Sequence, residues 1–249
     1  MSYVSLRFYA ELNDFLRDAQ KKVRFKIELN RRTSVKDLIE SLGVPHTEVE
    51  IILANGTSVD FSYIVEGEDD ISVYPMFESV DVTPILELRA KPLRQTRFVL
   101  DCHLGRLARY LRQFGFDTLY RNDYTDEELA QTSAEQNRTL LTRDRSLLKR
   151  SVITHGYFVR EFDPRRQLDE VINRFDLKKQ IIPFGRCTRC NGLVEAVEKQ
   201  AIEDQLEPKT RQYFDTFWHC TSCGQIYWEG SHVKHMIRLA DEVLNSASD

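Results

Sequence analysis

The sequence has 249 residues, of which 41% are hydrophobic and 30% charged, with 35 lysines and arginines against 39 acidic residues. This length suits about two domains, and the composition is ordinary for a soluble globular protein. No apolar run approaches the ~20 residues that span a bilayer, and the start lacks the features of a signal peptide. We therefore expect a cytoplasmic protein with no membrane partner.

The charge is distributed unevenly along the chain. Residues 1–84 carry a net charge of −6, residues 85–181 a net charge of +5, and residues 182–249 a net charge of −3. Most of the positive charge in the middle is arginine, whose guanidinium is shaped for bidentate phosphate contacts. A basic segment within an acidic chain points toward nucleic acid.

The first segment predicts a small α+β domain. Alternating or short apolar runs predict four strands, at residues 4–9, 23–29, 51–54 and 71–77. A helix capped by Thr33 or Ser34 and ended by Gly43 lies between the second and third strands. This arrangement fits a ubiquitin-like β-grasp, which we assign to residues 1–84.

The same segment resembles the small sulfur-carrier and ubiquitin-like proteins, especially at Asp69-Asp70-Ile71-Ser-Val-Tyr-Pro75. Those carriers act through a free C-terminal Gly-Gly. Here the corresponding stretch is Phe77-Glu78-Ser79-Val80-Asp81, and the chain continues beyond it. The resemblance therefore favours an accessory role, such as docking a protein partner, over carrier chemistry.

A connection from Thr83 to Pro92 leads into a region where strands and helices alternate. The predicted strands are residues 97–100, 116–120, 138–142 and 156–159. One helix carries apolar residues from Leu104 to Leu111 at helical spacing and ends at Gly115, and a second covers residues 126–137. This alternation predicts an α/β domain with a parallel sheet, which we assign to residues 93–182.

Three aspartates mark the candidate site. Asp101 and Asp144 each follow an apolar strand, and Asp126 begins the second helix. If the two strands are neighbours, the three carboxylates meet at one sheet edge, where a divalent cation such as magnesium or manganese relieves their repulsion. Each aspartate can instead serve only as a helix cap or dipole partner. Thr125-Asp-Glu-Glu128 matches a capping box, which favours a cap over a ligand for Glu128.

Arginines accompany these carboxylates. Arg106, Arg109 and Arg112 recur every three residues, which predicts a stripe along the first helix away from its apolar face. Arg143 and Arg145 flank Asp144. Positive charge at such a site suits a polyanionic substrate, although ordinary surface charge explains each arginine equally well.

The C-terminal segment carries two CxxC motifs, Cys187-Thr-Arg-Cys190 and Cys220-Thr-Ser-Cys223, separated by 29 residues. Four thiolates at this spacing predict a tetrahedral structural zinc site and a zinc ribbon, with a pair of disulfides or redox motifs as the alternative. Five aromatic residues surround the second motif, namely Phe214, Phe217, Trp218, Tyr227 and Trp228. We expect them to form the small core of this ribbon rather than to stack on bases. Helical spacing from Met236 to Val243 predicts a closing helix, and we assign residues 183–249 to this domain.

These motifs together resemble the Mut-seven C-terminal RNase family. The resemblance rests on a series of segments in order: Asp101-Cys-His-Leu-Gly-Arg-Leu-Ala-Arg-Tyr-Leu-Arg112, Gly115-Phe-Asp117, Asp126-Glu-Glu-Leu129, Leu141-Thr-Arg-Asp-Arg-Ser-Leu147, the paired CxxC motifs and Tyr227-Trp228-Glu229-Gly230-Ser231-His232. A β-grasp extension also accompanies this family in bacterial proteins.

The resemblance implies a PIN-like, metal-dependent nuclease that acts on single-stranded or structured RNA. It implies Asp101, Asp126 and Asp144 as the acidic residues, with Arg106, Arg109, Arg143 and Arg145 as candidates for substrate binding. A fourth acid is common in PIN nucleases, and Glu128 and Asp163 are weak candidates for it. For Cys102 and His103, a packing role is favoured over a place beside the metal. The alternatives are a non-catalytic RNA-binding or ribosome-associated module and an accessory factor in sulfur transfer.

Overall fold

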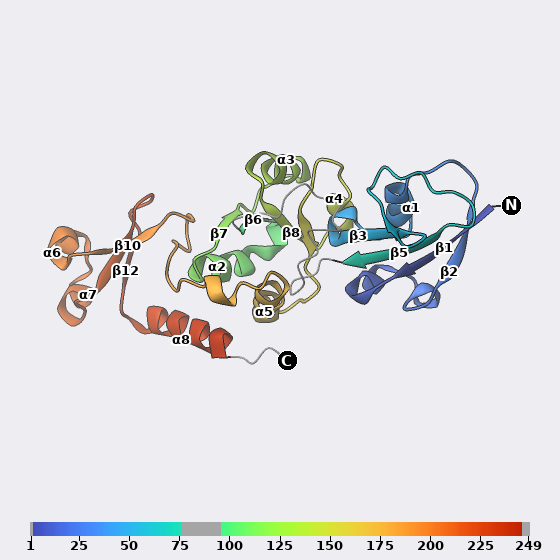
Figure 1. Ribbon diagram of the computed structural model, residues 1–249. Coiled ribbons are helices and arrows are strands. Elements are labelled where there is room, and N and C mark those ends of the chain that lie inside the picture. Colours follow the sequence, from blue (N-terminus) through green and yellow to red (C-terminus); the bar gives the residue numbers. More distant parts are fainter. Residues whose placement is uncertain (1, 76–95, 246–249) are drawn as a thin grey trace. The chain divides into compact units, whose positions relative to one another are not determined.

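The computed structural model describes residues 2–75 and 96–245 (Figure 1). The chain divides into two compact units, one formed by residues 1–95 and 126–158 and the other by residues 96–125 and 159–249. The predicted connection from Thr83 to Pro92 and the predicted end of a strand at Phe77 lie outside the described residues. Within the described ranges, no helix has both the length and the apolar character needed to cross a membrane.

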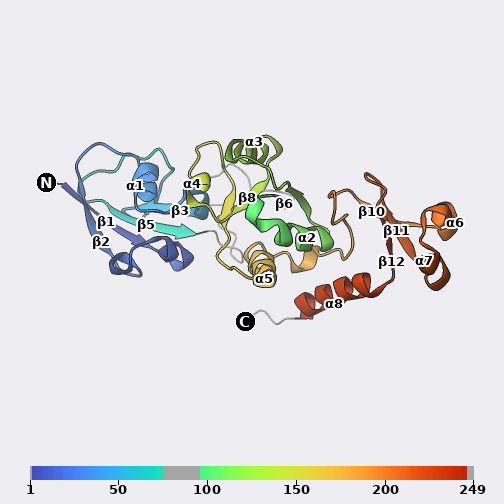
Figure 2. The ribbon, with the colours of Figure 1, turned by 180° about the vertical axis from the view of Figure 1, so that it is seen from behind.

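The first unit begins with a five-stranded sheet in the order β2-β1-β5-β3-β4. Its strands are β1 (Ser2–Phe8), β2 (Phe25–Leu29), β3 (Val49–Ala54), β4 (Thr57–Ser58) and β5 (Asp70–Pro75). Strand β1 pairs antiparallel with β2 and parallel with β5, so the first and last strands are central neighbours. Helix α1 (Val35–Ser41) buries Val35, Leu38 and Ile39 in the core of this unit, beside the sheet in Figures 1 and 2. The predicted ubiquitin-like β-grasp is confirmed.

Local signals explain where these elements begin and end. The Ser34 hydroxyl accepts a hydrogen bond from the Asp37 amide (3.1 Å) and caps α1. The chain leaves the helix through Gly43, whose φ of +101° lies in the left-handed region that glycine tolerates. Asn55 and Gly56 both have positive φ, which produces the tight β3–β4 hairpin. The short strand β4 was not predicted.

The remainder of the first unit contains part of the predicted α/β region. It comprises α3 (Asp126–Gln136), β8 (Thr139–Thr142), α4 (Arg145–Leu148) and β9 (Gly156–Phe158). Strands β8 and β9 are parallel, with Leu140 opposite Gly156 and Thr142 opposite Phe158. All four residues of β8 are buried, as expected of a strand covered on both faces.

The β-grasp segment is joined to β9 and the loop before it by buried polar contacts. His46 is 6% exposed; its Nδ1 lies 2.6 Å from the Glu40 carboxylate and its Nε2 lies 2.9 Å from the carbonyl oxygen of Ile153. Desolvation lowers the pKa of His46, and these two acceptors oppose that shift. The buried Glu48 carboxylate accepts a hydrogen bond from the Phe158 amide. Because buried polar groups need partners, these contacts fix the segment in place.

The second unit contains a parallel strand pair with two helices. It comprises β6 (Arg97–Leu100), a 3₁₀ turn (Cys102–Leu104), α2 (Gly105–Gln113), β7 (Asp117–Tyr120) and α5 (Pro164–Arg174). Strands β6 and β7 are parallel, from Arg97 opposite Asp117 to Leu100 opposite Tyr120. With the parallel β8–β9 pair, this confirms the predicted α/β class. Helix α5 was not predicted, although Asp163 caps it and Pro164 occupies its first turn.

The second unit ends in a small antiparallel sheet of the order β10-β11-β12. The elements are β10 (Val194–Val197), α6 (Lys199–Ile202), α7 (Pro208–Tyr213), β11 (Phe217–Cys220), β12 (Ile226–Trp228) and α8 (Ser231–Asn245). Four buried apolar residues, Val233, Met236, Leu239 and Val243, line one side of α8. The predicted closing helix is therefore confirmed.

We expect His46→Ala to lower the free energy of unfolding of the first unit by about 1–3 kcal/mol, because the Ile153 carbonyl loses its buried partner. Amide hydrogen exchange across residues 153–158 should accelerate in the variant. The control is His155→Ala, at a partly exposed histidine of the same region. Equal exchange in the two variants would show that the His46 contacts do not hold this segment.

Candidate active site and metal centre

Asp101 lies at the carboxyl end of β6. The strand residues Phe98, Val99 and Leu100 are fully buried, and the chain then turns into the 3₁₀ turn that precedes α2. The Asp101 side chain is 7% exposed; its Oδ1 accepts a hydrogen bond from the Cys102 amide (2.6 Å) and its Oδ2 lies 3.3 Å from His103 Nε2. The carboxylate therefore caps the turn, as the simpler interpretation predicted, and also faces an imidazole.

Asp101, Cys102 and His103 form a compact group of ionisable side chains. Each offers a potential ligand atom, and the three atoms lie within 4.8 Å of one another. Burial, reinforced by the neighbouring Asp101 carboxylate, raises the pKa of the Cys102 thiol, so the neutral thiol is favoured. The His103 side chain is 58% exposed, which contradicts the packing role favoured for it from the sequence. An exposed imidazole beside a buried carboxylate can transfer protons.

His103 also lines a cavity of about 960 Å³ in the second unit. The other charged residues of its lining are four arginines, Arg106, Arg109, Arg112 and Arg189. Arg106 and Arg109 are exposed and project from α2 on the side opposite the buried Leu107 and Leu111. In the described part of the chain, no aspartate or glutamate lines this cavity. It is therefore a basic hollow suited to an anion.

Arg112 departs from the predicted exposed stripe. Its side chain is buried, and its guanidinium donates hydrogen bonds to the carbonyl oxygens of Thr118 (2.9 Å), Thr188 (3.2 Å) and Arg189 (3.2 Å). Burial lowers the pKa of this guanidinium, but arginine remains charged at neutral pH. The prediction was wrong for Arg112 because two of these three partners lie in the first CxxC turn, about 76 residues along the chain.

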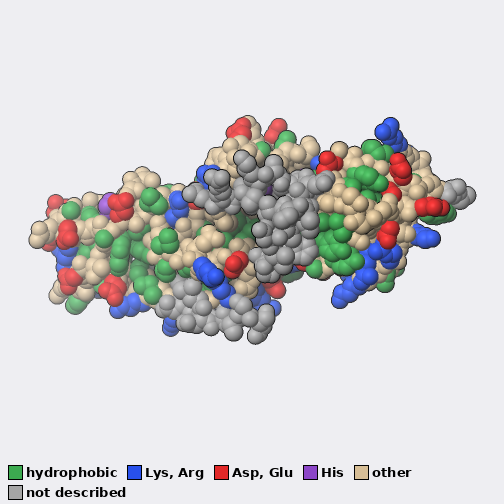
Figure 3. Space-filling view, viewed as in Figure 1, with side chains coloured by type: hydrophobic (Ala, Val, Ile, Leu, Met, Phe, Trp, Pro, Cys, Tyr) green, Lys and Arg blue, Asp and Glu red, His purple; other side chains and the backbone are tan. Residues whose placement is uncertain are grey.

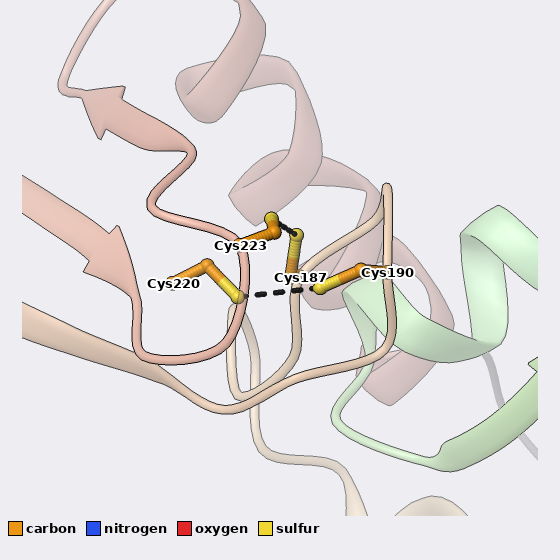
Figure 4. A group of neighbouring side chains, drawn as sticks. All are labelled: Cys187, Cys190, Cys220 and Cys223. Carbon is orange, nitrogen blue, oxygen red and sulfur yellow. Dashed lines mark hydrogen bonds between the residues drawn. The ribbon is translucent and has the colours of Figure 1, made fainter.

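The four cysteines of the CxxC motifs converge from two turns (Figure 4). Cys187 Sγ lies 3.7 Å from Cys223 Sγ, and Cys190 Sγ lies 3.4 Å from Cys220 Sγ. A tetrahedral zinc ion with Zn–S bonds of ~2.3 Å separates its ligands by about 3.8 Å. None of the four cysteines forms a disulfide bond in this structure, so the geometry does not support the disulfide alternative. The group therefore fits a single tetrahedral metal ion.

Further contacts orient the cysteine ligands. The amides of Gly192 and Ser222 each lie 3.4 Å from a cysteine sulfur, and Tyr227 Oη lies 3.1 Å from Cys187 Sγ. Burial raises the pKa of Tyr227 to about 12, so its hydroxyl stays protonated and can donate to a thiolate. Such outer contacts stabilise metal ligands.

The aromatic residues mostly form the ribbon core, as predicted. Phe217 and Tyr227 are buried, and Trp218 and Tyr227 each meet Phe184 edge to face, with centroids 5.3 and 5.1 Å away. Trp228 differs, because 37% of its surface is exposed. Phe184 also belongs to this core. The sequence did not predict it, because only the aromatic residues around the second CxxC motif were considered and Phe184 precedes the first.

The other predicted site residues belong to the first unit. Asp126 is exposed in the first turn of α3. Asp144 follows β8 and caps α4, accepting hydrogen bonds from the amide (2.7 Å) and hydroxyl (2.6 Å) of Ser146. The carboxylate of Asp163, a candidate fourth acid, caps α5 in the second unit. The joint site of Asp101, Asp126 and Asp144 stays a prediction.

The two arginines beside Asp144 differ in exposure. Arg143 is half-buried, and Arg145 is exposed. The Arg145 guanidinium lies over the rings of Phe15 and Phe158, 5.0 and 5.2 Å from their centroids. These cation–π contacts hold Arg145 against the β-grasp segment, and its role in substrate binding stays a prediction.

We expect Arg112→Lys to destabilise the second unit by about 1.5–3 kcal/mol, because an ammonium cannot reach all three carbonyls. Loss of metal to a chromophoric chelator should also accelerate. Arg106→Lys is the matched control, since Arg106 is exposed on the same helix. If both variants lose metal and unfold alike, the Arg112 contacts have no stabilising role.

Family models match both the N-terminal and the C-terminal part of this chain. A family model described as the Mut7-C RNAse domain matches residues 96–240, and a model described as Mut7-C ubiquitin matches residues 1–81. No curated protein matches the chain. Among solved structures, the crystal structure of H. volcanii small archaeal modifier protein 1 is similar at 13% identity and a TM-score of 0.25, over 31% of this chain and 100% of that one. The chain therefore belongs to the Mut7-C RNAse domain family, with a Mut7-C ubiquitin-like domain at its N-terminal side.

Proposed function

We propose that this protein is a divalent-metal-dependent ribonuclease that hydrolyses phosphodiester bonds in RNA. The observation that carries the proposal is the position of Asp101, a buried carboxylate at a strand end, beside His103 at a cavity lined by arginines. This arrangement lies within the segment matched by the RNase family model. Asp126 and Asp144 complete the proposed acidic set.

The proposed chemistry divides between carboxylates and basic groups. Asp101, Asp126 and Asp144 would provide the oxygen ligands that magnesium and manganese prefer; such a cation, when bound, activates water and polarises the phosphoryl group. Arg106 and Arg109 would bind phosphate oxygens and stabilise negative charge in the transition state. The His103 imidazole, whose Nε2 lies beside the Asp101 carboxylate, would pass a proton to the leaving oxygen from its other ring nitrogen, Nδ1. Arg143 and Arg145, which flank Asp144, would contact the RNA backbone beside this acidic set.

The test is cleavage of a labelled single-stranded RNA by the full chain with magnesium, with manganese or with no added divalent ion. We expect Asp101→Asn to lower the rate by at least ~100-fold, because the loss of a metal ligand removes several kcal/mol of transition-state stabilisation. The control is Asp123→Asn, at an exposed aspartate that is paired with Arg121. Equal cleavage rates for the wild type, Asp101→Asn and Asp123→Asn, or cleavage without divalent ions, would contradict the proposal. RNA binding without cleavage by the wild-type protein would instead favour a non-catalytic module.

We also propose that the four cysteines hold a structural zinc ion. Cys220→Ser should lower the zinc content from one ion per chain to well below one and destabilise the ribbon, because thiolate ligands favour zinc and a structural site contributes folding energy. Cys102→Ser is the control, since Cys102 lies outside the cluster, and it should retain one zinc ion. Elemental analysis by mass spectrometry measures both. Iron in place of zinc, or equal metal loss in both variants, would contradict this assignment.

A further inference from the structure

Arg189 occupies the turn between the first two metal-binding cysteines. Its backbone is held there, since its carbonyl oxygen accepts a hydrogen bond from Arg112, while its side chain is exposed. Arg106 and Arg109 share this exposure on α2. Within the described residues, none of these three guanidinium groups has a carboxylate partner. Exposed cations without acidic partners are available to neutralise phosphates, and this neutralisation strengthens the binding of a nucleic acid.

Three hollows of the second unit share walls at this point. The cavity that His103 lines shares Thr188 and Arg189 with a second hollow of about 310 Å³. The second shares Arg189, Ile226 and Trp228 with a third hollow of about 290 Å³. Arg189 borders all three. The three hollows therefore lie next to one another around Arg189, from His103 to Trp228, and together they are called the groove.

Trp228 gives the far end of this path a different chemistry. Its indole is partly exposed and borders the second and third hollows. The ring lies so close to Gly230 that an added Cβ would be 2.8 Å from its Nε1. Glycine at 230 therefore leaves the indole room to lie at the surface. A partly exposed indole can stack on an unpaired base, whereas the bases of a duplex are already stacked on one another.

We propose that the groove from His103 through Arg189 to Trp228 binds single-stranded RNA. This inference rests on the proposed ribonuclease function, and it specifies single-stranded RNA as the class of substrate. Arg106, Arg109 and Arg189 contact successive phosphates, and Trp228 stacks on a base outside the cleavage site. The zinc ribbon thus contributes to substrate binding through Arg189 and Trp228, in addition to its structural role.

The test measures binding, so it does not depend on cleavage. The full-length, zinc-loaded protein is titrated into a fluorescein-labelled single-stranded oligouridylate without added magnesium or manganese, and anisotropy gives the Kd. We expect Trp228→Ala to raise the Kd by about fivefold or more, and Trp228→Phe to restore most of the affinity because it retains a ring for stacking. The control is Tyr213→Ala, at an aromatic residue that is 69% exposed on α7 and borders none of the three hollows.

Arg189→Gln tests the phosphate contact separately. It should weaken binding and reduce the slope of log K against log salt by about 0.7, the value for one phosphate contact on a single strand. Zinc content and melting temperature are measured on every variant, and they should match the wild type. Unchanged affinity in correctly folded Trp228→Ala and Arg189→Gln proteins, or an equal loss for duplex RNA, would overturn the proposed groove. If binding behaves as expected and no metal-dependent cleavage is found, the nuclease proposal fails and the groove stands.

Discussion

The buried guanidinium of Arg112 connects the two parts of the second unit on which the proposed function depends. It joins α2 to β7 through Thr118 and to the first CxxC turn through Thr188 and Arg189. A charge buried to this extent is tolerated because several carbonyl oxygens solvate it. The same helix presents Arg106 and Arg109 to the cavity, so the contact sets the first CxxC turn relative to the basic surface. The green ribbon of this region passes beside the Cys187–Cys190 turn in Figure 4.

The β-grasp segment depends on a different set of buried polar contacts. His46 contacts the carbonyl oxygen of Ile153 in the loop before β9, and Glu48 accepts a hydrogen bond from the amide of Phe158. The Phe158 ring also packs against the β-grasp core. This part of its surface is therefore occupied within the chain, and docking of a protein partner would use another face. Acidic and basic side chains are interspersed on the face of this segment seen in Figure 3. One further contact joins the same parts: the Arg145 guanidinium of α4 lies over the Phe15 ring.

Patterns that act over a few residues were read correctly from the sequence. Period-two alternation located β1 and β2, and positive-φ residues at Gly43, Asn55 and Gly56 marked the ends and turns. The CxxC spacing identified the cysteine cluster before its geometry was known. Helix α5 carried a readable signal, Asp163-Pro164 before buried Leu168, but the prediction did not use it.

Features that depend on distant partners could not be read in this way. Arg106, Arg109 and Arg112 share one spacing, yet Arg112 is buried because carbonyl oxygens from other segments, including those of Thr188 and Arg189, surround its guanidinium. Arg145 looked equivalent to Arg143, whereas its aromatic neighbours come from Phe15 and Phe158. An aspartate after a strand can be a cap, a metal ligand or both. Asp101 and Asp144 do cap the turns that follow them, and this capping is compatible with the proposed role of both carboxylates as metal ligands.

The position of His103 beside Asp101 allows two chemistries that give different products. Attack by a metal-activated water yields linear phosphate ends and does not need the ribose 2′-hydroxyl, whereas an imidazole acting alone would use that hydroxyl as the nucleophile. The most direct measurement is therefore the end chemistry of the products from an RNA and from the same RNA with a single 2′-deoxy residue at the cleaved bond. The proposed mechanism requires linear ends and continued cleavage of the deoxy substrate with magnesium or manganese. A 2′,3′-cyclic phosphate, or loss of cleavage at the deoxy position, would contradict it.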